Sequence, residues 1–307
     1  MRGASVRRGT GPVRKEEIMK TIRAFIDGHP LLSFYALAFA ITWGGLIVVV
    51  GEPVEVLGTP VNFETRFSFV LLAWLAGPSV ASLLMTGLVH GRAGFRDLLA
   101  GMTRWRVGVR WYVVALLIAP FLTMAVLLAL SLHSPEYLPT ILTTSDKVAL
   151  VLLGIVGAIG AGIFEELGWT GFATPTLLRP GHGVLATGLV VGALWGVAHL
   201  PLYYWGSGDL SGTLSPALLL PAQILAWFLP FRVLMVWAYD RTGSLLLAML
   251  MHASLTASQV IFASLTAAAP LFTYVLVFGA VLWVVVAAVA LADHRHLSRQ
   301  PLWRRVA

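Results

Sequence analysis

Apolar stretches, each about as long as a lipid bilayer is thick, constrain this chain more than any other feature of its sequence. A helix that crosses the hydrocarbon core needs roughly 20 mainly apolar residues. The sequence contains eight such stretches, at about 31–51, 67–89, 112–132, from 148 onward, 184–204, 216–239, 244–264 and 271–292. We therefore expect an all-α, polytopic membrane protein with eight transmembrane helices.

The composition supports the same class of protein. Hydrophobic residues make up 58% of the 307 residues and charged residues only 11%, a balance that the surface of a soluble domain does not tolerate. The net charge of +7 is compatible with nucleic-acid binding, but Lys and Arg cluster between the apolar stretches, which is typical of membrane proteins. We therefore expect the lipid bilayer as a partner, no nucleic acid, and a multi-pass protein of the cell membrane. The absence of cysteine excludes disulfides, thiolate metal sites and a cysteine nucleophile.

Basic connections alternate along the chain with connections that hold at most one Lys or Arg. The basic ones are 1–30, 90–111, 176–183, 240–243 and 293–307. This alternation predicts eight crossings with both termini in the cytoplasm. It also divides the chain into a basic cytoplasmic arm (1–30), a single membrane domain (31–292) and a basic cytoplasmic tail (293–307). We expect the first apolar stretch to be a retained helix, and the basic, aromatic loop 90–111 to lie along the lipid headgroups.

Ionisable side chains other than Tyr occur at only five positions within these spans: Glu165, Glu166, His199, Arg232 and His252. A charged group at the centre of a spanning helix costs about 2.5–3.5 kcal/mol on insertion scales, so such groups are functional candidates. The competing interpretation is that they form salt bridges and hydrogen bonds that only hold helices together. Two adjacent carboxylates combined with two histidines favour chemistry.

Helical spacing predicts which of these groups act together. Glu165 and Glu166 point about 100° apart on a helix, so they have different roles. Three pairs of residues four apart share a helix face: Glu166 with Thr170, Trp195 with His199, and His252 with Thr256. Thr170 is therefore placed to orient Glu166 by a hydrogen bond.

Small residues at the same spacing predict close helix packing around these side chains. Gly188, Gly192 and Gly196 recur at every fourth residue, and the fourth span repeats the pattern in Gly157/Ala161 and Ala158/Gly162. Such stripes let helix backbones approach closely in a membrane. The packing is ordinary for a membrane protein, and it also brings the polar side chains together.

A carboxylate and two imidazoles in a low-dielectric pocket can activate water. The carboxylate acts as general base towards a water that hydrogen bonds or a metal hold in place. A glutamate together with His199 and His252 is a plausible set of ligands for zinc or another divalent metal, with the fourth position open. The residues leave open which of the two arrangements holds the water.

Three short motifs resemble those of the CAAX-protease and bacteriocin-processing family of intramembrane proteases, which includes the prenyl-protein endopeptidases. The family patterns are Glu-Glu-x-x-x-Arg, aromatic-x-x-x-His, and His-x-x-x-Asn or a similar small polar residue. They correspond here to Glu165-Glu166-Leu-Gly-Trp-Thr170, Trp195-Gly-Val-Ala-His199 and His252-Ala-Ser-Leu-Thr256. The resemblance covers about residues 150–260, which we take as the catalytic core.

The resemblance implies an eight-helix membrane fold and a CAAX prenyl-protease-like endopeptidase that cleaves a membrane-associated or lipidated peptide or protein. In that family's terms, Glu165 activates the water, while His199 and His252 position it and stabilise the oxyanion. Thr256 is a weaker substitute for the Asn. If a metal is bound, Glu165, His199 and His252 are its ligands.

One departure from the family pattern concerns the partner of Glu166. Thr170 stands where the family has Arg, which leaves the orientation of Glu166 without its usual cation. Arg232 is the sole cation inside a predicted span. We hypothesise that Arg232 supplies the missing countercharge.

Other functions compete with proteolysis. Gly206-Ser207-Gly208-Asp209 and Tyr239-Asp240 resemble motifs of intramembrane aspartyl proteases, but they occur in reverse order and at loop edges. A catalytically inactive scaffold or immunity protein of the same fold is favoured by the two Thr replacements and opposed by the retained glutamates and histidines. A proton-coupled transporter would use the same Glu and His set, but the paired, interrupted helices of transporters are not evident. A lipidated peptide, a leader peptide and a membrane-anchored regulator all remain open as substrates.

Overall fold

The computed structural model describes residues 12–50, 63–178, 182–206, 215–265 and 267–293 of the chain. Within these ranges it is built of helices, and no strand occurs in them. The longer helices are α1 (Pro12–Gly28), α2 (Pro30–Val50), α3 (Phe63–Met102), α4 (Val109–Ser131), α6 (Lys147–Gly168), α8 (Val184–Ala198), α11 (Leu229–Thr242), α12 (Leu245–Phe262) and α13 (Ala268–Ala292). The shorter ones are the 3-10 turn η1 (Pro135–Tyr137), α5 (Thr140–Thr143), the π-helix η2 (Trp169–Ala173), α7 (Thr174–Leu178), α9 (Leu200–Gly206), α10 (Pro216–Gln223) and the π-helix η4 (Ile224–Phe228).

Seven helical segments in the described ranges are long and apolar enough to cross a membrane. An eighth apolar helix, α8, is shorter than the predicted span 184–204 and ends at Ala198. Pro201 explains the difference, because it has no N–H to donate to the carbonyl of Val197 and so interrupts the helical hydrogen bonds. The all-α, polytopic membrane fold is as predicted, while the count of eight crossings and the cytoplasmic termini stay predictions.

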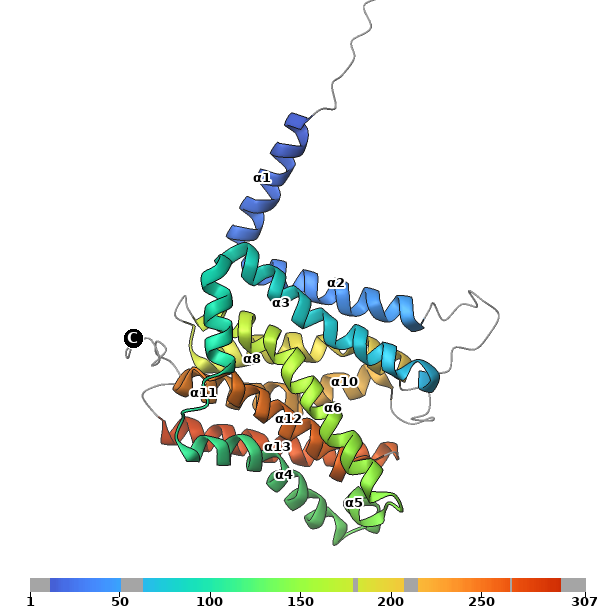
Figure 1. Cartoon of the computed structure of the whole chain (residues 1–307). Coiled ribbons are helices and arrows are strands. Elements are labelled where there is room, and N and C mark those ends of the chain that lie inside the picture. Colours follow the sequence, from blue (N-terminus) through green and yellow to red (C-terminus); the bar gives the residue numbers. More distant parts are fainter. Residues whose placement is uncertain (1–11, 51–62, 179–181, 207–214, 266, 294–307) are drawn as a thin grey trace, which may run out of the picture.

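The second predicted span continues well beyond residue 89. α3 runs on to Met102, with a bend at Gly91, whose φ of 58° is the left-handed conformation that glycine adopts easily. After this bend the helix turns across the ends of its neighbours (Figure 1), and Leu98 packs against Leu245 and Met249. The first part of the basic loop 90–111 is therefore a short helix docked on the bundle.

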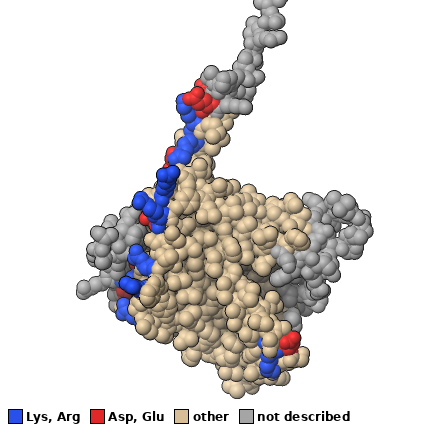
Figure 2. Space-filling view, in the orientation of Figure 1, with Lys and Arg blue, Asp and Glu red and all other residues tan. Residues whose placement is uncertain are grey.

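Exposed charged side chains lie at the margins of the face that Figure 2 shows. Figure 2 shows Lys and Arg along α1 and down one edge of the bundle, and a broad face between the margins without charge. α1 forms most of the predicted basic arm, while residues 1–11 and 294–307 of the arm and the tail lie outside the described residues. A charge-free face of this kind, on helices of this length, is what a multi-pass integral membrane protein presents to the bilayer.

Close packing at glycines positions the helices that carry the polar residues. A Cβ on Gly188 would lie 2.6 Å from the Cα of Val233, and one on Gly192 would lie 2.9 Å from the carbonyl oxygen of Phe228. α8 therefore packs directly on η4 and α11, as its glycine stripe predicts. Gly162 makes the equivalent approach between α6 and α12, where a Cβ would lie 2.5 Å from the Met249 carbonyl oxygen.

Candidate active site

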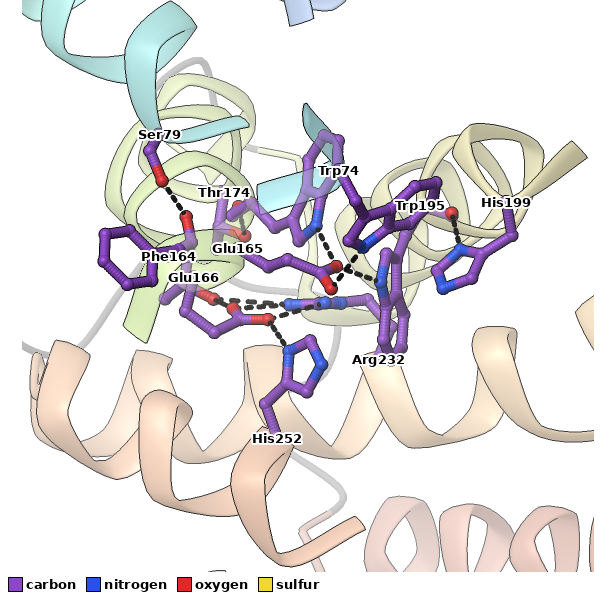
Figure 3. A network of polar contacts seen from close by, with 12 residues as sticks. Trp74, Ser79, Phe164, Glu165, Glu166, Thr174, Trp195, His199, Arg232 and His252 are labelled. Carbon is purple, nitrogen blue, oxygen red and sulfur yellow. Dashed lines mark hydrogen bonds and ion pairs between the residues drawn. The ribbon is translucent and has the colours of Figure 1, made fainter. Parts of the chain in front are cut away.

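Glu166 is completely buried and saturated with hydrogen-bond donors. Arg232 from α11 forms a bidentate ion pair with it, at 2.7 Å to Oε2 and 2.8 Å to Oε1. Nδ1 of His252 lies 2.7 Å from Oε1, and the Thr170 hydroxyl donates to Oε2. An ionised carboxylate has about four acceptor positions, and all of them are used here. Glu166 is thus a structural anion that fixes α6, α11 and α12 relative to one another (Figure 3).

These contacts bear on two sequence-based hypotheses. Thr170 does hydrogen-bond Glu166, as the four-residue spacing predicts. The ion pair between Arg232 and Glu166 is the countercharge that was expected to replace the Arg missing at position 170. Whether activity depends on that pair stays a prediction.

Glu165 lies in a very different environment, although it is the next residue. Its Oε1 accepts a hydrogen bond of 2.9 Å from the indole N–H of Trp74, and its Oε2 accepts from Trp169 at 3.0 Å and Trp195 at 2.9 Å. Its side chain is buried, with 3% of its surface exposed. Three uncharged donors hold this carboxylate, and about one of its four acceptor positions remains for a further donor.

Each of the two histidines makes a hydrogen bond through Nδ1. Nδ1 of His199 lies 2.8 Å from the carbonyl oxygen of Trp195, and because a carbonyl only accepts, Nδ1 carries the proton. Nδ1 of His252 contacts an ionised carboxylate, Glu166, so it also donates. In both rings Nε2 is left for another partner.

Trp195 connects the groups that were predicted to converge. Its N–H binds Glu165, its ring packs 5.0 Å from the ring of His252 and 6.0 Å from that of His199, and the guanidinium of Arg232 lies 4.4 Å above it. The ring of Trp74 also lies 4.5 Å from that of His199. The acid and both imidazoles therefore share one cluster around two indoles, in which Glu165 and His252 are buried and His199 is half-buried.

Two π-helices flank this cluster. η2 begins three residues after Glu166 and contains Trp169 and Thr170, which donate hydrogen bonds to Glu165 and Glu166 respectively. η4 directly precedes the helix of Arg232 and supplies Phe228, whose ring lies 4.7 Å from those of both Trp195 and His199. Single π-turns are frequent at functional sites.

Sequence reasoning missed Trp74 and Trp169. A tryptophan in an apolar span is ordinarily a packing residue, so neither indole is conspicuous by type. Trp169 had a detectable signal, since it is four residues after Glu165 and shares its helix face. Trp74 had none, because its contact joins helices that are 91 residues apart in sequence.

Thr256 lies one turn beyond His252, at the wall of a small cavity. The cavity holds about 120 Å³ and is also lined by Trp195, Trp227, Phe228 and Gln259. The position fits a role beside the cluster, but no contact tests the expectation that Thr256 replaces the family's Asn.

The described residues do not form a metal site. No three side chains of His, Asp or Glu in the described ranges lie close enough together to hold one metal ion. Both oxygens of Glu165 accept indole N–H groups. The set Glu165, His199 and His252 therefore does not fit a metal in this arrangement, and we derive no step through one.

Only one residue of the competing aspartyl pair lies in the described part of the chain. Asp240 is buried near the end of α11, whereas Asp209 lies outside the described residues. Asp240 is not among the described residues that form the cluster around Trp195.

Comparison with protein families agrees with the motifs. The model described as "Type II CAAX prenyl endopeptidase Rce1-like" matches residues 147–258. No curated protein matches the chain. The matched segment begins and ends with α6 and α12 and contains both glutamates, both histidines and Arg232, and it nearly coincides with the predicted core of 150–260. Residues 147–258 are therefore a domain of the Rce1-like type II CAAX prenyl endopeptidases, within the CAAX-protease and bacteriocin-processing family that the motifs indicated.

Proposed function

We propose that the protein is an intramembrane endopeptidase in which Glu165 is the general base. The observation that carries this proposal is the difference between the two glutamates. Glu166 is neutralised by Arg232 and fully occupied, whereas Glu165 is held by uncharged donors and retains an acceptor position. A base must keep its charge and be able to accept a proton from water.

In the proposed reaction, a water bound to the free position of Glu165 loses a proton to it and attacks the carbonyl carbon of the scissile peptide bond. Nε2 of His199 accepts a hydrogen bond from the other O–H of that water and so orients it. His252, when protonated on Nε2, donates to the oxyanion, and the charge of the imidazolium balances that of the oxyanion, while Nδ1 keeps its hydrogen bond to Glu166. Glu165 then passes its proton to the leaving amine, and the two peptide products separate.

The substrate class follows from the family and from the location of the site. The family name describes peptidases that act on prenylated proteins, and the cluster lies among the membrane-spanning helices. We propose a membrane-associated substrate whose lipid keeps it at the bilayer, with Thr256 beside the reacting carbonyl as a weak donor. The cavity next to Thr256 has room for a small side chain or a few waters.

The test is a peptidase assay on the full chain in detergent, with a fluorogenic peptide carrying a farnesylated cysteine and the same peptide without the lipid. The variants are Glu165→Gln, His199→Ala and His252→Ala. We expect Glu165→Gln to lower kcat by at least about 10²-fold, since general-base catalysis contributes about 10²–10⁴-fold. His133→Ala, in an exposed connection, is the matched control for the histidines.

Three outcomes separate the hypotheses. Loss of cleavage in all three variants, with normal thermal stability, supports the protease. Cleavage that survives Glu165→Gln would exclude Glu165 as the base. A protein that cleaves neither peptide, but whose cellular effect survives all three substitutions, would be the inactive scaffold.

A further inference from the structure

A groove on the outside of the bundle lies between α4, α11 and α13 and holds about 600 Å³. It is separate from the candidate active site, because α11 stands between them. Arg232 and Trp237 are five residues apart on this helix, so their side chains point about 140° apart. Arg232 faces Glu166, and Trp237 lines the groove.

The body of the groove is apolar. Val285, Ala288 and Val289 of α13 line one wall, and Val114 of α4 lines another. The ring of Trp111 lies 4.9 Å from that of Trp237 and joins α4 to α11. Within a bilayer, a hollow of this kind is complementary to a hydrocarbon chain.

One end of the groove is polar. Arg110, Arg241 and Asp293 lie there, at the ends of the three helices that were predicted to face the cytoplasm. Arg241 pairs with Asp293, which also accepts a 3.0 Å hydrogen bond from the Trp237 indole. Arg110 is exposed and stacks at 5.4 Å over the ring of Trp111, and no carboxylate of the described residues pairs with it. Within the described part of the chain, Arg110 is therefore the cation at this end of the groove that has no carboxylate partner.

We propose that this groove binds a phospholipid with an anionic headgroup, whose acyl chain lies along α13 and whose phosphate contacts Arg110. The chain accounts for the apolar body, and the phosphate for the cation at its end. Tryptophans at the border between the two regions are typical of the membrane interface, where such headgroups lie. Basic residues at this level attract anionic lipids in the cytoplasmic leaflet.

The experiment is native mass spectrometry of the full chain in detergent, titrated with phosphatidylglycerol or with phosphatidylcholine of the same acyl chains. One cation near the membrane surface contributes about a five-fold change in anionic lipid binding, so Arg110→Gln should weaken phosphatidylglycerol binding about five-fold and leave phosphatidylcholine unchanged. Arg106→Gln is the matched control, because Arg106 stacks on Trp105 in the same way but does not line the groove. Ala288→Phe, at an exposed position of the groove, should weaken binding of both lipids.

Other results would overturn the proposal. Equal losses from Arg110→Gln and Arg106→Gln would mean a general attraction to the basic face. Unchanged binding in Ala288→Phe would place the lipid elsewhere. Competition by millimolar inorganic phosphate would show that the site recognises a free anion and not a lipid.

Discussion

At the scale of single residues, two neighbouring carboxylates on one helix are set to different tasks by their donors. Cationic and hydroxyl donors saturate Glu166, and three indoles hold Glu165 without neutralising it. Hydrogen bonds to an ionised group are stronger than neutral ones, so both side chains are fixed in place. The acid with the ion pair, Glu166, and the acid that we propose as the base, Glu165, are therefore adjacent in sequence but differently bound.

Replacing Arg232 by Leu tests the structural role of Glu166. Removing one partner of a buried ion pair costs about 3–5 kcal/mol of folding free energy, because the other charge is left buried and unpaired. We expect a clear fall in melting temperature in detergent and loss of peptidase activity. Arg23→Leu, which breaks an exposed pair with Asp27, should change stability by less than about 1 kcal/mol.

Position 170 offers a rescue of that variant. The Thr170 hydroxyl lies 3.4 Å from a guanidinium nitrogen of Arg232, so a cation introduced there would occupy the vacated space. The double substitution Thr170→Arg with Arg232→Leu should recover stability and at least part of the activity. Full activity in the single Arg232→Leu variant would refute the countercharge hypothesis.

Replacing Trp74 by Phe tests the proposed role of Glu165 as the base. Trp74→Phe keeps the ring against His199 but removes the N–H that binds Oε1 of Glu165. A misplaced catalytic group costs up to about 10²-fold, so we expect kcat to fall at least ten-fold with little change in KM. The comparison is Trp283→Phe, which removes an indole bond of the same kind to the Leu225 carbonyl on the outside of the bundle. Equal kinetics in both variants would make Trp74 a packing residue only.

At the scale of helices, the contact between α6 and α12 sets the geometry of the cluster. Gly162→Ala would place a Cβ 2.5 Å from the Met249 carbonyl oxygen, which forces α12 and its His252 away from Glu166. Overpacking of this kind costs about 1–3 kcal/mol. We expect a lower melting temperature and reduced activity.

Gly157 on the same helix provides the control. A Cβ there would meet no atom within 4 Å, so Gly157→Ala should leave stability within about 0.5 kcal/mol of the unmodified protein. If the two alanine variants melted at the same temperature, the close approach of α6 and α12 at Gly162 would not contribute to stability.

The elements show what sequence could predict and where it failed. The lengths of the apolar stretches predict most of the spans, and the few ionisable residues in those stretches predict the polar cluster. Both are readable from sequence because the free energy of inserting a segment into a membrane depends on its composition. The end of α8 near Pro201, the bend at Gly91 and the two π-helices depend on local backbone geometry, which hydropathy does not report. The indole of Trp74 depends on tertiary packing between helices distant in sequence.

At the scale of the whole molecule, the candidate site lies well inside the bundle, away from the ends of the helices that carry it. Arg232 precedes the last residue of α11 by ten residues, and His252 follows the first residue of α12 by seven. At 1.5 Å per residue, the cluster is about 10–15 Å from the ends of these helices. That depth favours a substrate that reaches the site from the bilayer, provided these ends face the cytoplasm.

Orientation is therefore the prediction on which the route of the substrate depends. The chain contains no cysteine, so single cysteines can be introduced without removing any others. We expect His133→Cys and Ser264→Cys to react with a membrane-impermeant maleimide in intact cells. Lys20→Cys, Thr103→Cys and Ser298→Cys should react only after permeabilisation, because the basic connections stay in the cytoplasm. The reverse pattern would mean that the protein has the opposite orientation. Labelling of Ser298→Cys but not of Lys20→Cys from outside would mean an odd number of crossings.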